Sequence, residues 1–398
     1  MSPAPLRLKK DQDRRLLAGH CWVYSNEVDT EATPLKDLEP GQPVEVLSQR
    51  GRWLGYGYVN PRSLICARIV SHHRARPLSP ALLVERIRVA LALRQRLYAR
   101  PFYRLIHGEG DALPGLIVDR YDDLLAVQIT TAGIERERAE VLAALEQVLR
   151  PRHIVLRNDN PVRAQEGLPQ AIEWVLGSDP GPLILTEGEV RFAVNPGQGQ
   201  KTGWFFDQAD NRLALHRFGC HGRVLDVCCY LGAWGLQAAA AGASAVTLVD
   251  SAASALEQAG ANAERNGLVE RVSGLHGDAF EALRALRADQ ERFDLVILDP
   301  PAFIKRRKDL AEGERAYQRL NRLGLEVLSP GGLLVTSSCS FHLQRDAFIQ
   351  VMQRAARRAG VGLQLLQAAG QGPDHPVHPA IPETSYLKTL VLRALPAV

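Results

Sequence analysis

The chain has 398 residues, of which 46% are hydrophobic, and its formal net charge is +4. The length exceeds what one ordinary hydrophobic core accommodates, so we expect two or three folded domains. No window approaches 18 consecutive apolar residues and the first residues are charged, which argues against a membrane span or a secretory leader and favours a cytoplasmic protein without a membrane partner.

Residues 1–73 contain short β-prone runs (WVYSNEV, PVEVLS, WLGYGYV, LICARIV) separated by Gly, Pro and Asn. Runs of this length and spacing predict a small β-barrel or sandwich. Residues 74–190 follow a different pattern. Helical periodicity covers 81–99 and 136–150, two strands over 113–130 meet at a turn at Asp122 and Asp123, and HIVLRN (153–158) predicts a further strand. This second region is expected to be an α+β domain.

From residue 191 to the end at 398, apolar strands alternate with helices rich in Ala and Leu. The predicted strands are RVLDVCC, AVTLVD, RVSGLHGD, FDLVILD and GGLLVTSSC. Such a pattern predicts an α/β domain with a Rossmann-like, doubly wound and mostly parallel sheet that helices cover on both faces. Sheets of this kind bind ligands at the carboxyl ends of their strands, so a site is expected there.

The first three strand ends carry candidate cofactor ligands. A tight turn with Gly232 follows the first strand, but DVCCYLG lacks the GxGxxG pattern that serves a dinucleotide. Asp250 ends the second strand, about 20 residues further on, where a carboxylate suits a ribose diol. Asp278 and Ala279 follow the third strand and are placed to contact an adenine edge. The fourth strand ends at Asp299, and the two prolines after it fix a stiff loop.

This order of motifs resembles class I S-adenosylmethionine-dependent methyltransferases. NPGQGQKTGWFFDQADNR (195–212), LAGHCWVYSNEV (17–28), SSCS (337–340) and DHPVHPAIPETSYLKTLVL (374–392) resemble one branch of them. That branch consists of bacterial enzymes that methylate cytosine C5 in 23S ribosomal RNA and carry an N-terminal PUA domain. The resemblance covers the whole chain.

The resemblance implies a PUA-like RNA-binding β-barrel over 1–73, a central α+β domain over 74–190 and a methyltransferase domain over 191–398. It implies S-adenosylmethionine as the cofactor and 23S ribosomal RNA, or a large-subunit assembly intermediate, as the partner. The residues that it assigns to the cofactor are Lys201, Thr202, Phe206, Asp207, Arg212, Asp226, Tyr230, Gly232, Asp250, Asp278, Ala279 and Asp299. Asp207 and Arg212 are also compatible with a simple ion pair at a helix cap.

Cys339 lies at the end of the last predicted strand. A free cysteine is ordinarily a small buried hydrophobe. The match to the family's SSCS motif instead implies a nucleophile whose thiolate adds to C6 of the cytosine. Adjacent strands would bring this thiol and Asp299 to one pocket, where Asp299 would orient the base. Pro300 stands where related enzymes often have a second cysteine, so the group that removes the C5 proton stays open.

The basic run Lys305, Arg306, Arg307 and Lys308 directly follows the stiff loop. Its position favours contacts with RNA phosphates over a merely solvated loop, and the target base is expected to leave its stack.

The other cysteines are irregularly spaced without a CxxC pair, which indicates reduced thiols. His375 and His378 lack a third candidate ligand, so we expect a structured loop rather than a metal site.

Two alternatives remain at this stage. The enzyme could methylate guanine N7 or N2 in ribosomal RNA, in which case Cys339 would only pack. Alternatively, the chain could be an RNA-binding or ribosome-assembly factor with an inactive methyltransferase fold, although the intact acids argue against this. The sequence leaves open which nucleotide is modified, whether naked RNA or a subunit is bound, and whether the chain forms a homodimer.

Overall fold

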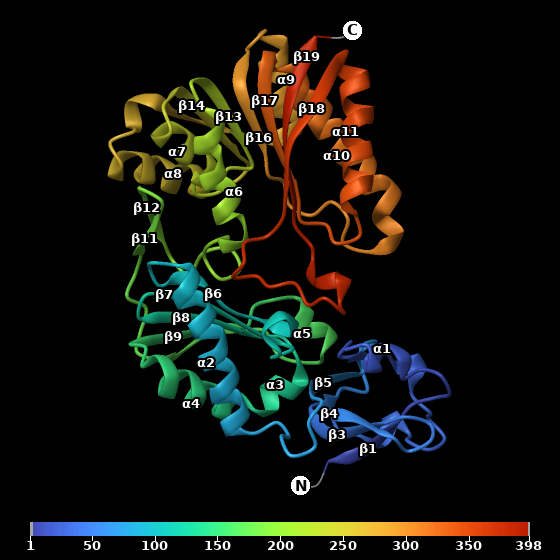
Figure 1. Cartoon of the computed structure of the whole chain (residues 1–398). Coiled ribbons are helices and arrows are strands. Elements are labelled where there is room, and N and C mark those ends of the chain that lie inside the picture. Colours follow the sequence, from blue (N-terminus) through green and yellow to red (C-terminus); the bar gives the residue numbers. More distant parts are fainter. Residues whose placement is uncertain (1–2, 397–398) are drawn as a thin grey trace. The chain divides into compact units, whose positions relative to one another are not determined.

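Four β-sheets organise residues 3–396, the part of the chain that this computed structural model describes. The chain divides into two compact units, each built from segments that are separate in the sequence (Figure 1). The first unit comprises Met1–Leu183, Val194–Phe206 and Pro373–Thr384. The second comprises Ile184–Ala193, Asp207–Gly372 and Ser385–Val398.

The first sheet has the strand order β1-β3-β4-β5-β2. Its strands are β1 (Ala4–Arg7), β2 (Trp22–Val23), β3 (Gln42–Leu47), β4 (Trp53–Val59) and β5 (Ala67–Ser71), and the short helix α1 spans Arg14–Leu17. The prediction of a small β-domain is confirmed, with one local difference. The run WVYSNEV forms only a two-residue strand, because a 3-10 turn follows in which the Glu27 carboxylate accepts from the Tyr24 N–H at 2.8 Å.

The second sheet has the order β10-β9-β8-β7-β6 and carries helices on one face (Figure 1). The strands are β6 (Phe102–His107), β7 (Leu116–Tyr121), β8 (Leu124–Ile129), β9 (His153–Arg157) and β10 (Ile172–Leu176). The helices are α2 (Pro80–Leu97), α3 (Ala132–Arg136), α4 (Arg138–Leu149) and α5 (Val162–Gln165). Leu83 and Ile87 of α2 and Leu145 of α4 share a core with the sheet. The predicted turn between β7 and β8 is confirmed, and Asp122 has a positive φ of 56° in it.

The second unit contains the seven-stranded sheet β15-β14-β13-β16-β17-β19-β18. The strands are β13 (Gly222–Val227), β14 (Ala243–Asp250), β15 (Val272–His276), β16 (Phe293–Leu298), β17 (Leu328–Ser338), β18 (Val361–Ala369) and β19 (Lys388–Pro396). Pairing is parallel from β15 to β17, whereas β19 runs antiparallel to both β17 and β18. The strand order reverses at β13 and β16, and such a switch point is where open α/β sheets bind ligands.

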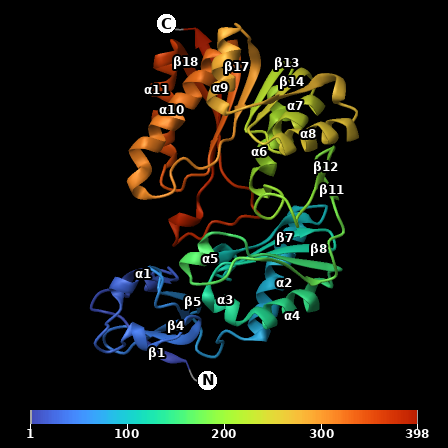
Figure 2. The same ribbon diagram turned by 180° about the vertical axis from the view of Figure 1, so that it is seen from behind.

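Helices cover both faces of this sheet (Figures 1 and 2). Trp234 of α7 (Ala233–Ala240) and Ala259 of α8 (Ala253–Arg265) pack on one face. Leu283 of α9 (Ala279–Ala288), Tyr317 of α10 (Leu310–Glu326) and Phe348 of α11 (Arg345–Ala359) pack on the other. The predicted doubly wound architecture is therefore confirmed.

A two-stranded hairpin of β11 (Leu183–Glu187) and β12 (Val190–Val194) precedes the short helix α6 (Ala209–Leu213). The predicted domain boundaries near residues 73 and 190 stay predictions. Over residues 3–396, every helix is too short or too polar to cross a lipid bilayer.

Candidate active site

The loop after β13 adopts an unusual backbone conformation at three alternating positions. Cys228, Tyr230 and Gly232 have φ values of 65°, 50° and 77°. Only glycine adopts this left-handed conformation without cost, and other residues there store about 1–2 kcal/mol each. A Cβ atom at Gly235, the third residue of α7, would lie only 2.4 Å from a Leu248 methyl carbon. The loop therefore holds its backbone close to the sheet at the switch point.

Asp226 anchors this loop from the end of β13. Its side chain is fully buried, and its Oδ2 accepts a hydrogen bond from the Gly235 N–H at 2.8 Å. Its Oδ1 has no hydrogen-bond partner among residues 3–396. Burial raises the pKa of Asp226 to about 7, although the Gly235 N–H opposes the shift and the nearby acids Asp299 and Asp250 add to it. A buried acceptor without a partner is expected to bind a donor from a ligand.

Asp250 and Asp278 both accept backbone hydrogen bonds. Asp250 binds the N–H of Tyr230 through Oδ2 and that of Ala252 through Oδ1, each at 2.9 Å, so it orders the loop and starts α8. Asp278 caps the N-terminus of α9 through one oxygen. A carboxylate accepts about four hydrogen bonds, so both acids keep capacity for a ligand. Ala279 is the first residue of α9.

Asp299 follows β16 and is held from two sides. The Gln208 Nε2 donates to its Oδ1 at 3.1 Å and its Oδ2 at 3.2 Å, and the Trp234 indole N–H donates to Oδ2 at 3.0 Å. Burial raises the pKa of Asp299, while the bond from Trp234 opposes the shift. The same Gln208 nitrogen lies 3.1 Å from the Ser337 Oγ in β17. One amide therefore joins the ends of two neighbouring strands.

Gln208 and its neighbours were not predicted from the sequence. Asn211 Nδ2 donates to the Gln208 Oε1 at 2.7 Å, and Thr389 Oγ1 donates to the same oxygen at 3.2 Å. Because the oxygen accepts two bonds, the amide nitrogen is turned toward Asp299. The signal was available, since Gln208 stands next to Asp207 in the motif NPGQGQKTGWFFDQADNR.

Asp207 and Arg212 each contact other side chains in the structure. The Tyr386 hydroxyl donates to Asp207 at 2.6 Å. Arg212 forms two hydrogen bonds with Glu187, and both side chains are buried. These contacts account for the burial of both residues, and their assignment to the cofactor stays a prediction.

Cys339 directly follows β17 and is partly exposed. As predicted, β17 pairs with β16, the strand that leads to Asp299. The Ser340 Oγ accepts from the Ile304 N–H at 3.1 Å and shares a hydrogen bond with the Tyr317 hydroxyl at 3.0 Å. The Ile304 bond connects the loop after Asp299 to the segment that carries Cys339.

Three other predicted cofactor residues belong to the first compact unit. Thr202 donates to the Asp119 carboxylate, and its carbonyl accepts from the Tyr121 hydroxyl at 3.0 Å. Phe206 packs on the Tyr121 ring, with the two ring centroids 5.3 Å apart. The Lys201 ammonium lies 4.8 Å from the centroid of the Phe205 ring. The predicted role of Lys201, Thr202 and Phe206 toward the cofactor stays a prediction.

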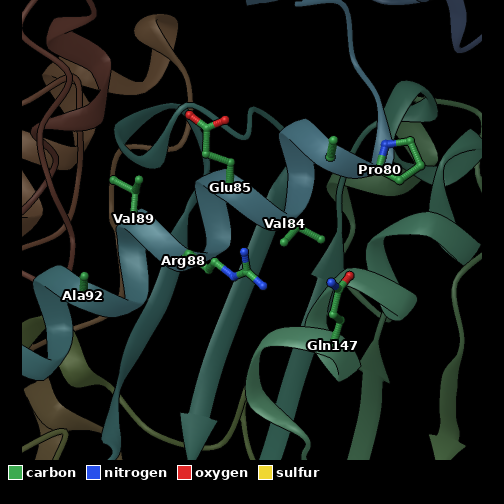
Figure 3. A pocket seen from close by; sticks show the side chains of 8 residues that line it. Pro80, Val84, Glu85, Arg88, Val89, Ala92 and Gln147 are labelled. Atoms are coloured by element: carbon green, nitrogen blue, oxygen red, sulfur yellow. The ribbon is translucent and has the colours of Figure 1, made fainter.

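The basic run 305–308 is exposed, and its only ion pair among residues 3–396 joins Arg306 to Asp309 at 3.3 Å. His375 is buried in the first unit, where its Nδ1 lies 2.8 Å from the Asp374 carboxylate. Within residues 3–396, no group of three or more His, Cys, Asp or Glu has an arrangement that could hold a metal ion. A groove along α2 and α4, lined by Val84, Arg88 and other residues, contains none of the predicted site residues (Figure 3).

Comparisons with known proteins match two families to this chain. Residues 6–72 match the PUA-like domain family, and residues 103–393 match the family of S-adenosylmethionine-dependent methyltransferases. A solved structure of a SAM-dependent methyltransferase from Streptococcus mutans superposes with a TM-score of 0.84, covers 98% of this chain and 100% of that one, and is 22% identical. At this identity it supports the fold alone. A methyltransferase structure complexed with S-adenosylhomocysteine superposes equally well.

The fold, the acids at the strand ends and the match to the family together define an S-adenosylmethionine-dependent methyltransferase. Curated relatives narrow the family. Proteins of Tolumonas auensis, Serratia proteamaculans and Aeromonas salmonicida, each named ribosomal RNA large subunit methyltransferase I, are 35–36% identical. The alignments cover 97–98% of this chain and 98–99% of the relatives. The chain therefore belongs to the family of ribosomal RNA large subunit methyltransferase I.

The residues at the switch point fit the cofactor of this family. S-adenosylmethionine carries a sulfonium and an amino group, and both are positively charged. Burial and the negative charges of four acids together raise the pKa of the Cys228 thiol to about 12: Asp250, Asp299, Asp226 and Asp278. These acids create a negative potential at the loop, which favours a cationic ligand. The Asp226 Oδ1, which has no hydrogen-bond partner among residues 3–396, is an acceptor of the kind that a cationic ligand needs.

Proposed function

We propose that this enzyme methylates C5 of a cytosine in 23S ribosomal RNA, either free or within a large-subunit assembly intermediate. The names of the full-length relatives support ribosomal RNA of the large subunit as the substrate class. The PUA-like domain supports RNA binding. The choice of cytosine rests on one observation: Cys339 follows the strand next to Asp299, and Gln208 bridges Asp299 to Ser337, two residues before the thiol.

Cytosine C5 needs activation before it accepts a methyl group. In our proposal the Cys339 thiolate attacks C6, so that an S–C6 bond forms and the C5=C6 electron pair becomes available at C5. S-adenosylmethionine, when bound, supplies the methyl group as an electrophile. Removal of the C5 proton then returns the electron pair to the ring and expels the thiolate, which regenerates Cys339.

Asp299 is assigned to the N3 edge of the base. Negative charge develops there when the thiolate adds to C6, so a proton donor at N3 lowers the barrier. Burial raises the pKa of Asp299, which makes its carboxyl group easier to protonate than an exposed one. The hydrogen bonds from Gln208 and Trp234 fix the carboxyl group in one orientation.

The acids of the switch point are assigned to the cofactor: Asp226 to its amino group, Asp250 to its ribose and Asp278 to its adenine. Tyr230 and Gly232 provide the loop backbone that the cofactor approaches. The exposed run from Lys305 to Lys308 is assigned to contacts with RNA phosphates. These contacts hold the RNA backbone beside the loop while the target base is flipped out.

Methylating full-length 23S RNA with a radiolabelled donor, followed by nuclease mapping and bisulfite sequencing, tests the proposal. We expect the label on one cytosine, which the C5 methyl group protects from bisulfite conversion. Label on a guanine would refute the cytosine assignment and leave Cys339 as a packing residue. If neither 23S RNA nor an assembly intermediate is labelled although the cofactor binds, the proposed substrate class is refuted.

A further inference from the structure

Lys388 is a buried cation beside the proposed nucleophile. It is the first residue of β19, its relative exposure is 4%, and it pairs in register with Ser338 of β17. Its Nζ donates to the backbone carbonyl of Ser340 at 2.6 Å and to that of Tyr386 at 2.8 Å. The ammonium therefore contacts Ser340, the residue after Cys339, while the Lys388 backbone pairs with Ser338, the residue before it.

This cation has no acidic partner among residues 3–396. Neither Asp nor Glu is among the charged groups that act on Lys388 there, and carbonyl groups receive two of its three N–H donors. A lysine is almost never fully buried without a counter-charge, because desolvation of the ammonium is costly. An apolar side chain of similar length would fill the same space at lower cost. The position therefore retains a charge for a reason other than packing.

The electrostatic surroundings identify that reason. The pKa of Lys388 is lowered to about 8, mainly by burial; a charge on Cys339 opposes this shift, and Arg345 of α11 adds to it. A Coulomb interaction is mutual, so the ammonium favours a negative charge on the Cys339 sulfur just as that charge favours the ammonium. Tyr317 of α10, a further titratable group near this segment, has a raised pKa because of burial and stays a neutral phenol near pH 7.

We propose that Lys388 is a positioning residue that holds the Cys339 thiol in its thiolate form and fixes the 338–340 backbone around it. The inference rests on the proposed function, in which Cys339 is the nucleophile. The thiolate acts as the counter-ion that the buried ammonium otherwise lacks. Lys388 needs no contact with the RNA or with the cofactor for this role.

Alkylation of Cys339 by iodoacetamide as a function of pH tests the role without any RNA. Trypsin cleaves after Arg322 and Arg345, so the peptide 323–345 contains Cys339 as its only cysteine and can be followed by mass spectrometry. We expect the wild-type protein to show an alkylation midpoint below the pH of about 8.5 that is typical of a free thiol. A midpoint at or above that value would overturn the inference, and this measurement needs no variant.

Variants sharpen the test. Lys388→Met should move the midpoint upward by at least about one unit, which lowers the alkylation rate at pH 7 about tenfold, because one pKa unit is a tenfold change in thiolate. Lys388→Arg, which keeps the charge, should stay closer to wild type. An unchanged profile in folded Lys388→Met would contradict the proposal.

Arg345→Gln removes an exposed cation from the same neighbourhood and serves as the matched control. We expect a smaller shift of the alkylation midpoint than in Lys388→Met, because solvent screens the charge of Arg345. The substitution also removes one tryptic site, so Cys339 is followed on the longer peptide 323–354, which still contains a single cysteine. A shift as large as that of Lys388→Met would assign the effect to the general charge of the region and overturn the inference.

Methyl transfer provides the second readout. In Lys388→Met the rate should fall and its pH profile should move upward with the alkylation midpoint, while the affinity for S-adenosylmethionine stays within about twofold. If alkylation shifts but no cytosine is methylated, the proposed function fails and the effect of Lys388 on the thiol stands. If cytosine is methylated and the thiol profile is unchanged, the proposed function stands and Lys388 has no such role.

Discussion

The side-chain amide nitrogen of Gln208 lies 3.1 and 3.2 Å from the two carboxylate oxygens of Asp299. The same nitrogen contacts the Ser337 hydroxyl, so the ends of β16 and β17 are linked through one amide. Asp299 and the segment that leads to Cys339 are thereby held together at the carboxyl ends of these two parallel strands.

Gln208→Ala should impair catalysis more than cofactor binding. The substitution frees the Asp299 carboxyl group to rotate, and loss of such an orienting partner typically costs about 10- to 100-fold in activity. We expect a fall of that size in the methyl-transfer rate, with S-adenosylmethionine affinity measured by calorimetry changed less. Gln364→Ala, at an exposed position of β18, is the matched control. Equal activity in the two variants would show that Gln208 does not orient Asp299.

Asp226 should make the cofactor-free protein less stable at neutral than at mildly acidic pH. Its pKa in the folded state is raised from 3.8 to about 7, so the folded protein binds this proton more tightly than the unfolded chain does. Stability from this group is therefore fully present below about pH 4, the unfolded pKa, and is lost as the pH rises toward 7. We expect Asp226→Asn to raise the melting temperature at pH 7.5 but to change it much less at pH 4.5.

The same substitution has an opposite effect on the cofactor. The asparagine side chain has one acceptor oxygen and no charge, so the affinity of Asp226→Asn for S-adenosylmethionine should fall. Thermal melts across pH and calorimetry at pH 7.5 check both effects. A variant that is less stable than wild type at every pH would contradict the account of this buried acid.

Cys228→Gly should stabilise the fold. Cys228 has a φ of 65°, which costs about 1 kcal/mol or more for a residue with a Cβ atom, and glycine removes this strain at a smaller entropic cost. We expect the free energy of unfolding in urea to rise by about 0.5–1 kcal/mol. Ala240→Gly, in the ordinary helical backbone of α7, is the control and should lower it by a similar amount. A loss of stability in Cys228→Gly would show that side-chain packing outweighs backbone strain there.

The sequence predicted the parallel strands of the seven-stranded sheet well, because short apolar runs such as FDLVILD are typical of buried parallel strands. It also predicted that Asp299 and Cys339 follow neighbouring strands. The antiparallel strands β18 and β19 were not predicted individually, since their runs carry Gln, Arg and Pro among the apolar residues. The segment Pro373–Thr384 belongs to the first unit although it lies near the end of the chain, which no local pattern reveals.

The contacts that shape the candidate site join residues far apart in the sequence, so no local sequence pattern predicts them. Gln208, Asp299 and Ser337 are far apart in sequence, and only the sheet brings them together. The backbone of the loop after β13 was missed for another reason. The turn at Gly232 was predicted, but the left-handed backbone of Cys228 and Tyr230 was not, because residues with a Cβ atom rarely adopt it.

The central claim is that the Cys339 sulfur bonds to the target base. Transfer to 23S RNA that contains 5-fluorocytidine tests it most directly, because a fluorine at C5 cannot leave as a proton and the adduct persists. We predict a covalent RNA adduct on the tryptic peptide 323–345 of the wild-type enzyme, and none in Cys339→Ala, which should still bind S-adenosylmethionine within about twofold of wild type. An adduct on Cys228 instead, or wild-type methylation by Cys339→Ala, would contradict the account.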